Sequence, residues 1–258
     1  MGRQVECALN NNPSFLIRQL RRPADPFPAP GRRYSPVRDW PRPGAVPSPA
    51  GLFDGDRMAR FYERLDETLQ EFIRRQHLFF VATAPRSGRI NLSPKGADTF
   101  RVIDDRHVAY QDITGSGNET AAHLLDDGRL TVMFCSFDPD PLILRLYGHG
   151  RALRHGDEGW PALSGRFAAL PGVRQIVLLA VESVQTSCGY AVPHYRYEGD
   201  RDTYLRWAQK KGTAGLAAYQ EQKNLVSIDG LPTGLRPDAL LPESGAAQPD
   251  PPSSTLKS

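Results

Sequence analysis

A junction of glycine and hydroxyl residues is the first place in this chain where chemistry is expected. The stretch YQDITGSGNETAAHL (110–124) runs from a strand-like segment through a turn into a helix start. Backbone N–H groups at a helix start attract anions, so Ser116, Gly117 and Asn118 are candidate anion-binding residues. The S-x-x-E spacing of Ser116 and Glu119 also fits a capping box, which satisfies such N–H groups internally. The two roles are compatible, because the box uses the N–H of Glu119 and leaves those of Gly117 and Asn118 free.

Polar side chains gather on one face of a strand predicted before that junction. In RINLSPKG (89–96) the alternation of a strand separates polar from apolar residues. The polar face carries Arg89, Asn91, Ser93 and Lys95. Ile90 and Leu92 point the other way. Cationic and hydroxyl side chains on one face are suited to hold an anion such as a phosphate.

Two later strands repeat this arrangement. Thr99 and Arg101 share a face in TFRVI, and Arg145 and Tyr147 share one in ILRLYGHGRALR. Any single face of this kind is explained by solvent on the outer side of a half-buried sheet. Three such faces beside a glycine-bracketed helix start favour a convergent anion site.

Other catalytic motifs are incomplete in this sequence. The G-S-G turn lacks the third glycine of a dinucleotide fingerprint, and there is no G-x-x-x-x-G-K-[ST] phosphate loop. The histidines show neither H-x-x-x-H nor H-E-x-x-H pairing, so we expect no protein-bound catalytic metal. Cys188 and His194 could form a thiol nucleophile and its base, but a cysteine at a strand end is more typical of packing.

Hydrophobic periodicity predicts the elements that position these residues. Apolar residues at helical spacing predict an amphipathic helix over about 58–76, with Asp56 as its cap. Strands are predicted at 78–84, 89–93, 99–103, 107–112, 129–137, 143–154 and 174–187. Further helices are predicted at 116–126, at 157–169 and, broken at Gly212, at 200–223. Closely spaced strands with few inserted helices indicate a mainly β (α+β) fold, an antiparallel barrel with peripheral helices.

Composition divides the chain of 258 residues into three parts. A Pro- and Arg-rich leader (1–57) and a Pro-rich tail (232–258) are predicted to be disordered, which leaves one domain at 58–231. The leader holds nine arginines and five acidic residues, a local +4, so the rest of the chain contributes −1 to the net charge of +3. The basic character belongs to the leader, which argues against a nucleic-acid-binding face on the domain.

The sequence also indicates the compartment. No apolar run approaches the roughly 20 residues that span a bilayer, and the N-terminus lacks the apolar segment of a secretory signal. Three widely spaced cysteines support neither a disulfide framework nor a zinc cluster. We therefore expect a cytoplasmic protein without membrane or nucleic-acid partners.

The run INLSPKGADTFRVIDDRHVAYQDITGSGNETAAHLLDDGRLTVMFCSF, followed by ILRLYGHGRAL, resembles the pyridoxamine 5′-phosphate oxidase-like family of FMN-binding split barrels. The resemblance implies an antiparallel split β-barrel and a homodimer with FMN in a groove at the subunit interface. It also implies three groups of cofactor-binding residues. The end of the strand at 89–95 supplies Ser93 and Lys95, with Arg89 a weaker match. The next strand borders the flavin ring and ribityl chain with Gln111 and Asp112, and the helix start supplies Ser116, Gly117 and Asn118.

The chain departs from the oxidase branch of that family at two points. The oxidase places an Arg-Lys pair after the helix-start serine, where this chain has Gly117 and Asn118. The oxidase's C-terminal Arg-Leu-Ala-Pro is also missing, which argues against vitamin B6 synthesis. The resemblance thus implies an FMN-dependent oxidoreductase acting on an unassigned small molecule. A non-catalytic flavin carrier and a deazaflavin- or haem-using relative on the same barrel stay open as alternatives.

Overall fold

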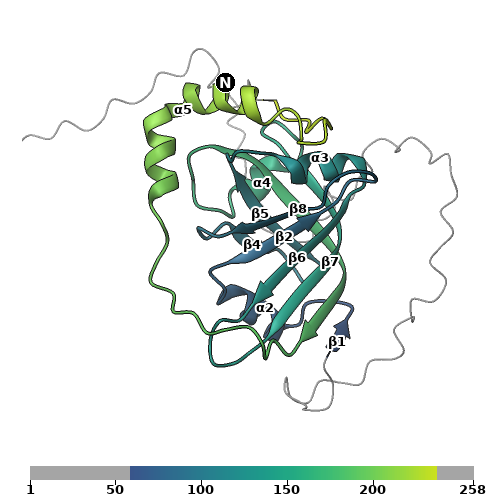
Figure 1. The fold of residues 1–258 in the computed structure, drawn as a ribbon. Coiled ribbons are helices and arrows are strands. Elements are labelled where there is room, and N and C mark those ends of the chain that lie inside the picture. Colours follow the sequence, from purple (N-terminus) through teal and green to yellow (C-terminus); the bar gives the residue numbers. More distant parts are fainter. Residues whose placement is uncertain (1–58, 237–258) are drawn as a thin grey trace, which may run out of the picture.

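The computed structural model describes residues 59–236 (Figure 1). The predicted leader and residues 237–258 of the predicted tail lie outside the described residues. Residues 232–236, which the prediction placed in the tail, are described, and Thr233 and Leu235 among them are buried. Eight antiparallel strands form one sheet. They are β1 (Ala59–Tyr62), β2 (Phe79–Thr83), β3 (Asn91–Lys95), β4 (Phe100–Val102), β5 (His107–Ile113), β6 (Arg129–Cys135), β7 (Ile143–Leu153) and β8 (Val173–Ser187).

The strand order is β3-β2-β6-β7-β8-β5-β4, and β1 pairs with the C-terminal part of β8. The sheet curls into a half-barrel, which confirms the predicted mainly β split-barrel class (Figure 1). The register of β7 against β8 shifts between Tyr147 and Gly148. A Cβ atom at Gly148 would lie 1.9 Å from the carbonyl oxygen of Ala180, so only glycine permits this close approach.

Four helices flank the sheet in the described part of the chain. They are α2 (Glu67–Arg74), α3 (Glu119–Asp126), α4 (Trp160–Ser164) and α5 (Thr203–Lys223). The predicted break in the last helix is confirmed, because Gly212 has φ 65° and ψ 173° inside α5. The second half of α5 lies over the end of the barrel that carries α3 (Figure 1). Among the described residues, no helix is both long and apolar enough to cross a membrane.

The prediction of a helix over 58–76 is wrong in its first half. Residues 59–62 form β1, and the helix begins only at Glu67. Asp66 caps it, because its carboxylate accepts a hydrogen bond of 2.8 Å from the backbone N–H of Leu69. The spacing of Phe61 from the apolar residues that follow it fits a helix, but residues 59–62 pair with β8 as a strand. Tertiary contact therefore overrides the local pattern.

The core fills the concave side of the sheet. Its buried side chains come mainly from α2 and from five of the strands. The largest include Leu69, Phe79, Tyr110, Phe134, Leu144 and Val184. A smaller apolar cluster lies under α4 around Leu163, Ile176 and Leu178. Together they anchor β5 and β8, the strands that carry much of the site described next.

Candidate functional site

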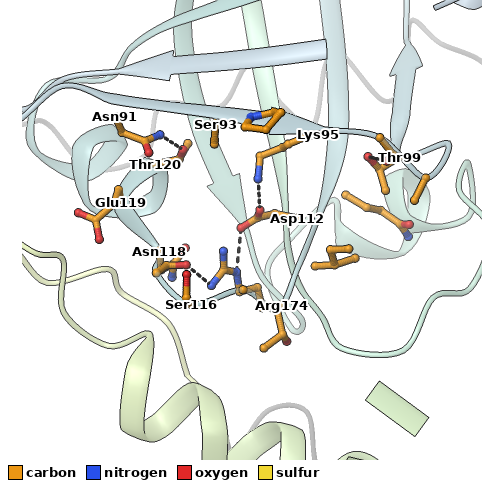
Figure 2. A pocket seen from close by; sticks show the side chains of 18 of the residues that line it. Asn91, Ser93, Lys95, Thr99, Asp112, Ser116, Asn118, Glu119, Thr120 and Arg174 are labelled. Carbon is orange, nitrogen blue, oxygen red and sulfur yellow. Dashed lines mark hydrogen bonds and ion pairs between the residues drawn. The ribbon is translucent and has the colours of Figure 1, made fainter. Parts of the chain in front are cut away.

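A pocket of about 610 Å³ opens between β3, the end of β5 and the start of α3 (Figure 2). Most of the residues predicted from the sequence line it. They are Asn91, Ser93, Lys95, Gln111, Asp112, Ser116, Gly117 and Asn118. Further lining comes from the loop 96–99, from Arg174 on β8 and from Asp200 and Arg201 before α5.

Strand β3 presents its polar face to this pocket, as alternation predicted. Asn91, Ser93 and Lys95 are half-buried, whereas Leu92 between them is 65% exposed. The amide of Asn91 donates to Thr120 Oγ1 at 3.2 Å, which ties β3 to the first turn of α3. The polar side of this edge strand therefore faces inward and its apolar side faces outward.

Two predicted residues lie elsewhere. Arg89 precedes β3 on an exposed loop and forms an ion pair with Asp229. Arg145 lies on β7, where its guanidinium donates to Ser187 Oγ at 3.1 Å. Strand alternation placed both residues on polar faces. In the sheet, however, β2 and β6 lie between β7 and β3, so Arg145 does not reach the pocket.

The pocket wall contains an ionic group formed by the half-buried Lys95 with the buried Asp112 and Arg174 (Figure 2). Lys95 Nζ lies 2.9 Å from Asp112 Oδ1, and Arg174 Nε lies 2.9 Å from Asp112 Oδ2. Burial alone would raise the pKa of Asp112, but the charges of Arg174 and Lys95 and their hydrogen bonds hold it well below its usual range. Asp112 is thus ionised, and two cations sharing one carboxylate leave a local charge of +1.

The charge in the pocket is polarised and does not sum to a net positive value. Besides the ionic group, the lining includes Arg201 and two carboxylates, Glu119 and Asp200. Glu119 is held by the backbone N–H of Ile228, which donates to both of its oxygens at 3.1 Å. The excess positive charge is therefore confined to the part of the pocket beside Lys95 and Arg174.

Arg174 and Gln175 were missed by the sequence analysis. Gln175 faces Asp112 across the β5–β8 ladder and donates to Asp112 Oδ2 at 2.7 Å and to Asn118 Oδ1 at 2.8 Å. Arg174 Nη1 donates to the carbonyl oxygen of Gly117 at 2.7 Å. These two side chains join the ionic group to the glycine turn. Only the strand register places them there.

The capping box predicted from Ser116 and Glu119 is wrong. The N-cap of α3 is Asn118, whose side chain makes no capping hydrogen bond to the helix. Gln175 and the backbone of Asn224 hold the Asn118 side chain instead, at 2.8 and 3.3 Å, and delay the helix start. Ser116 is exposed and its hydroxyl bonds no described residue. The first N–H groups of α3 are thus left without a side-chain cap, as an anion site requires.

The loop 96–99 closes the pocket beside Lys95. Ala97 and Asp98 both adopt left-handed backbone conformations, with φ of 57° and 51°. Such angles are unfavourable for residues other than glycine and tend to occur at functional sites. Arg101 is held here by the Asp98 carboxylate and lines a neighbouring pocket of about 530 Å³, which shares Gly96, Thr99 and Asp200 with the first.

Nucleophile and metal chemistry find little support within residues 59–236. No group of three or more His, Cys, Asp or Glu side chains is arranged to hold a metal there. Cys188 is half-buried at the end of β8, and no described bond joins it to His194. Neither residue lines the pocket of the ionic group.

The chain resembles known proteins in sequence. The sequence profile of the family described as pyridoxamine 5′-phosphate oxidase matches residues 65–188. The pyridoxamine 5′-phosphate oxidase family protein ustO of Aspergillus flavus is 40% identical over 195 residues, which cover 68% of this chain and 78% of that protein.

Solved structures give weaker likenesses. HupZ of Group A Streptococcus is 22% identical, with a TM-score of 0.38, over 46% of this chain and 91% of its own. The FAD binding protein of Mycobacterium smegmatis is 17% identical, with a TM-score of 0.34, over 48% of this chain and 94% of its own. The assignment rests on the sequence matches. The chain belongs to the pyridoxamine 5′-phosphate oxidase family.

Proposed function

We propose that this protein is an FMN-dependent oxidoreductase that works as a homodimer on a small molecule. The observation that carries the proposal is the ionic group of Lys95, Asp112 and Arg174 beside the uncapped start of α3. Two cations and free backbone N–H groups converge there, and this combination is suited to a phosphate.

The residues present fit FMN in size and polarity. A pocket of about 610 Å³ lies within the usual range of small-molecule sites. Lys95, Arg174 and the hydroxyls of Ser93 and Ser116 would hold the phosphate. Gln111, buried at the end of β5, would border the ring and ribityl chain. Because Asp112 already neutralises part of the cationic charge, we expect moderate and not extreme affinity.

A bound flavin supplies hydride and electron transfer, and the chain's own residues bind, orient and exclude water. The neighbouring pocket of about 530 Å³ shares Gly96, Thr99 and Asp200 with the flavin pocket. It therefore offers room for a substrate next to the flavin. The strained Ala97–Asp98 turn would separate the two ligands.

The test is a titration of the purified full-length protein with FMN and with riboflavin, followed by absorbance and fluorescence. We expect a yellow complex and tighter binding of FMN than of riboflavin, since only FMN carries the phosphate. Oxidation of NAD(P)H by the FMN complex would then separate an enzyme from a non-catalytic carrier. A Soret band in the isolated protein, or no binding of either flavin, would contradict the proposal.

A further inference from the structure

A segment near the C-terminal end of the described chain packs directly on the anion-binding turn. We call residues 220–233 the clamp. Gln220 Nε2 donates to Thr114 Oγ1 at 2.7 Å, and Asn224 Nδ2 donates to the Gly115 carbonyl at 3.0 Å. In return Asn118 Nδ2 donates to the Asn224 carbonyl at 3.3 Å. The clamp thus contacts the turn on both sides of Ser116.

The contacts of Gln220 with Thr114 and of Asn118 with Asn224 are buried, and that of Asn224 with Gly115 is partly buried. Gln220, Asn224 and Thr233 have no exposed surface, and Asn118 is 2% exposed. Thr233 Oγ1 donates to the Asn224 carbonyl at 2.6 Å, so the end of the clamp supports its beginning. Hydrogen bonds in such a dry environment fix geometry strongly, because water cannot replace them.

The clamp is not built for stability alone. Gln220 Oε1 and Asn224 Oδ1 are buried and have no hydrogen-bond partner among the described residues. A buried acceptor without a donor costs free energy, and an apolar side chain of the same size would avoid that cost. The side-chain amides of Gln220 and Asn224 therefore matter because their N–H groups bind the turn.

The clamp also lies beyond the residues that match the family profile, which end at 188. We infer that Gln220 and Asn224 are positioning residues of the phosphate-binding turn, so that docking of the clamp and binding at the turn are coupled. This inference rests on the proposed function for the identity of the ligand, FMN. By linkage, a ligand that needs the ordered turn stabilises the docked clamp, and loss of the docked clamp weakens the ligand.

The experiment compares Gln220→Met with Gln222→Met in the full-length protein. Gln222 is exposed on the same helix and serves as the matched control. Hydrogen–deuterium exchange is measured over peptides spanning residues 112–119, and FMN and riboflavin affinities are measured in parallel. Asn224→Leu, which removes the second contact, repeats the test if Gln220→Met does not fold.

We expect Gln220→Met to speed exchange at 112–119 and to weaken FMN binding by about 2- to 12-fold, the effect of one hydrogen bond. Riboflavin affinity and melting temperature should match those of the control. In the wild-type protein, added FMN should slow exchange in the clamp.

Two results would overturn the inference. One is exchange at 112–119 equal to that of Gln222→Met. The other is an equal loss of FMN and riboflavin binding together with a lowered melting temperature, which would make Gln220 purely structural. If the wild-type protein binds neither flavin, the proposed function fails, but exchange at 112–119 in the free protein still decides whether the clamp positions the turn.

Discussion

Lys95 and Arg174 share one carboxylate, so each sets how much positive charge the other presents to a ligand. A lysine–phosphate contact is a charge-assisted hydrogen bond worth roughly 1.5–3 kcal/mol. We predict that Lys95→Ala weakens FMN binding by about 10- to 150-fold, measured by fluorescence titration.

Riboflavin and Lys210→Ala are the controls for that prediction. Riboflavin lacks the phosphate and should bind the wild type and Lys95→Ala about equally. Lys210 is exposed in the first half of α5, outside the clamp, and its removal should change neither affinity. Equal losses for both flavins would show that Lys95 supports the fold and not the phosphate.

Asp112 should make stability depend on pH in a defined window. Its folded pKa lies well below the usual value because of Arg174 and Lys95, and the unfolded pKa is about 3.9. The stabilisation that ionised Asp112 gives the folded protein is therefore fully present above about pH 5 and is lost progressively as the pH falls below the unfolded pKa. Asp112→Asn leaves the buried Arg174 and the half-buried Lys95 without their counter-charge and should lower the free energy of unfolding by about 3–5 kcal/mol at pH 7.

Urea unfolding of the wild type and Asp112→Asn at pH 7 and at about pH 3 checks this prediction. The difference between the two proteins should shrink at the lower pH. A difference that grows on acidification would mean that the folded pKa of Asp112 is raised and that the ionic group is misassigned.

At the scale of elements, α5 carries two glycines with opposite roles. Gly212 lies at φ 65° and ψ 173°, a region that side chains disfavour, although a Cβ there would meet no atom within 4 Å. Gly215 lies in the regular helix, where a Cβ would make an ordinary 3.4 Å contact with Lys211. Gly212→Ala should therefore lower the free energy of unfolding by roughly 1–3 kcal/mol, and Gly215→Ala should raise it by roughly 0.5–1 kcal/mol.

Thermal unfolding of the two variants gives the comparison. Because both substitutions add the same methyl group to the same helix, opposite signs isolate the backbone conformation as the cause. A stabilising Gly212→Ala would show that α5 continues straight through this position in solution.

Local features of this fold can be predicted from the sequence, whereas features that depend on contacts between distant residues cannot. Alternation located β3 and its inward polar face correctly, because side-chain direction is a property of the strand itself. The break at Gly212 was predictable for the same reason. The role of Arg174 was not predictable, because a charged residue at the start of an apolar run resembles a strand boundary. Only the pairing of Asp112 with Gln175 brings Arg174 to the site. The segment at 59–62 likewise needed its distant partner, β8.

At the scale of the whole molecule, packing continues almost to residue 236. Thr233 is fully buried, Leu235 is 8% exposed, and Arg154 donates to the Thr233 carbonyl at 2.5 Å. A protein truncated to 59–236 should keep its melting temperature within a few degrees of the full chain. Ending the chain at 231 removes the buried Thr233 and should clearly lower the melting temperature. Equal melting temperatures for both truncations, by calorimetry, would contradict this.

The proposed homodimer gives a second whole-molecule prediction. β3 is an edge strand whose outward Leu92 is 65% exposed, next to Ile90 at 78%. Exposed apolar side chains on a sheet edge invite pairing with another chain. We predict a dimeric mass by light scattering at micromolar concentration and a shift toward monomer for Leu92→Glu. Leu205→Glu, on α5, is the control and should leave the mass unchanged. A monomeric wild type would refute the dimer.

The clamp has a consequence for the order in which the protein is made. Gln220 and Asn224 reach back 106 and 109 residues to the turn they hold. A ribosome has therefore synthesised all eight strands of the described sheet before the last parts of the site emerge. A domain folds largely as a unit once its residues have emerged, so the ligand-binding turn stays unsupported until the clamp has been made. On the proposed function, cofactor uptake then follows synthesis of the clamp, and flavin supplied before residues 220–224 have emerged would find no completed site.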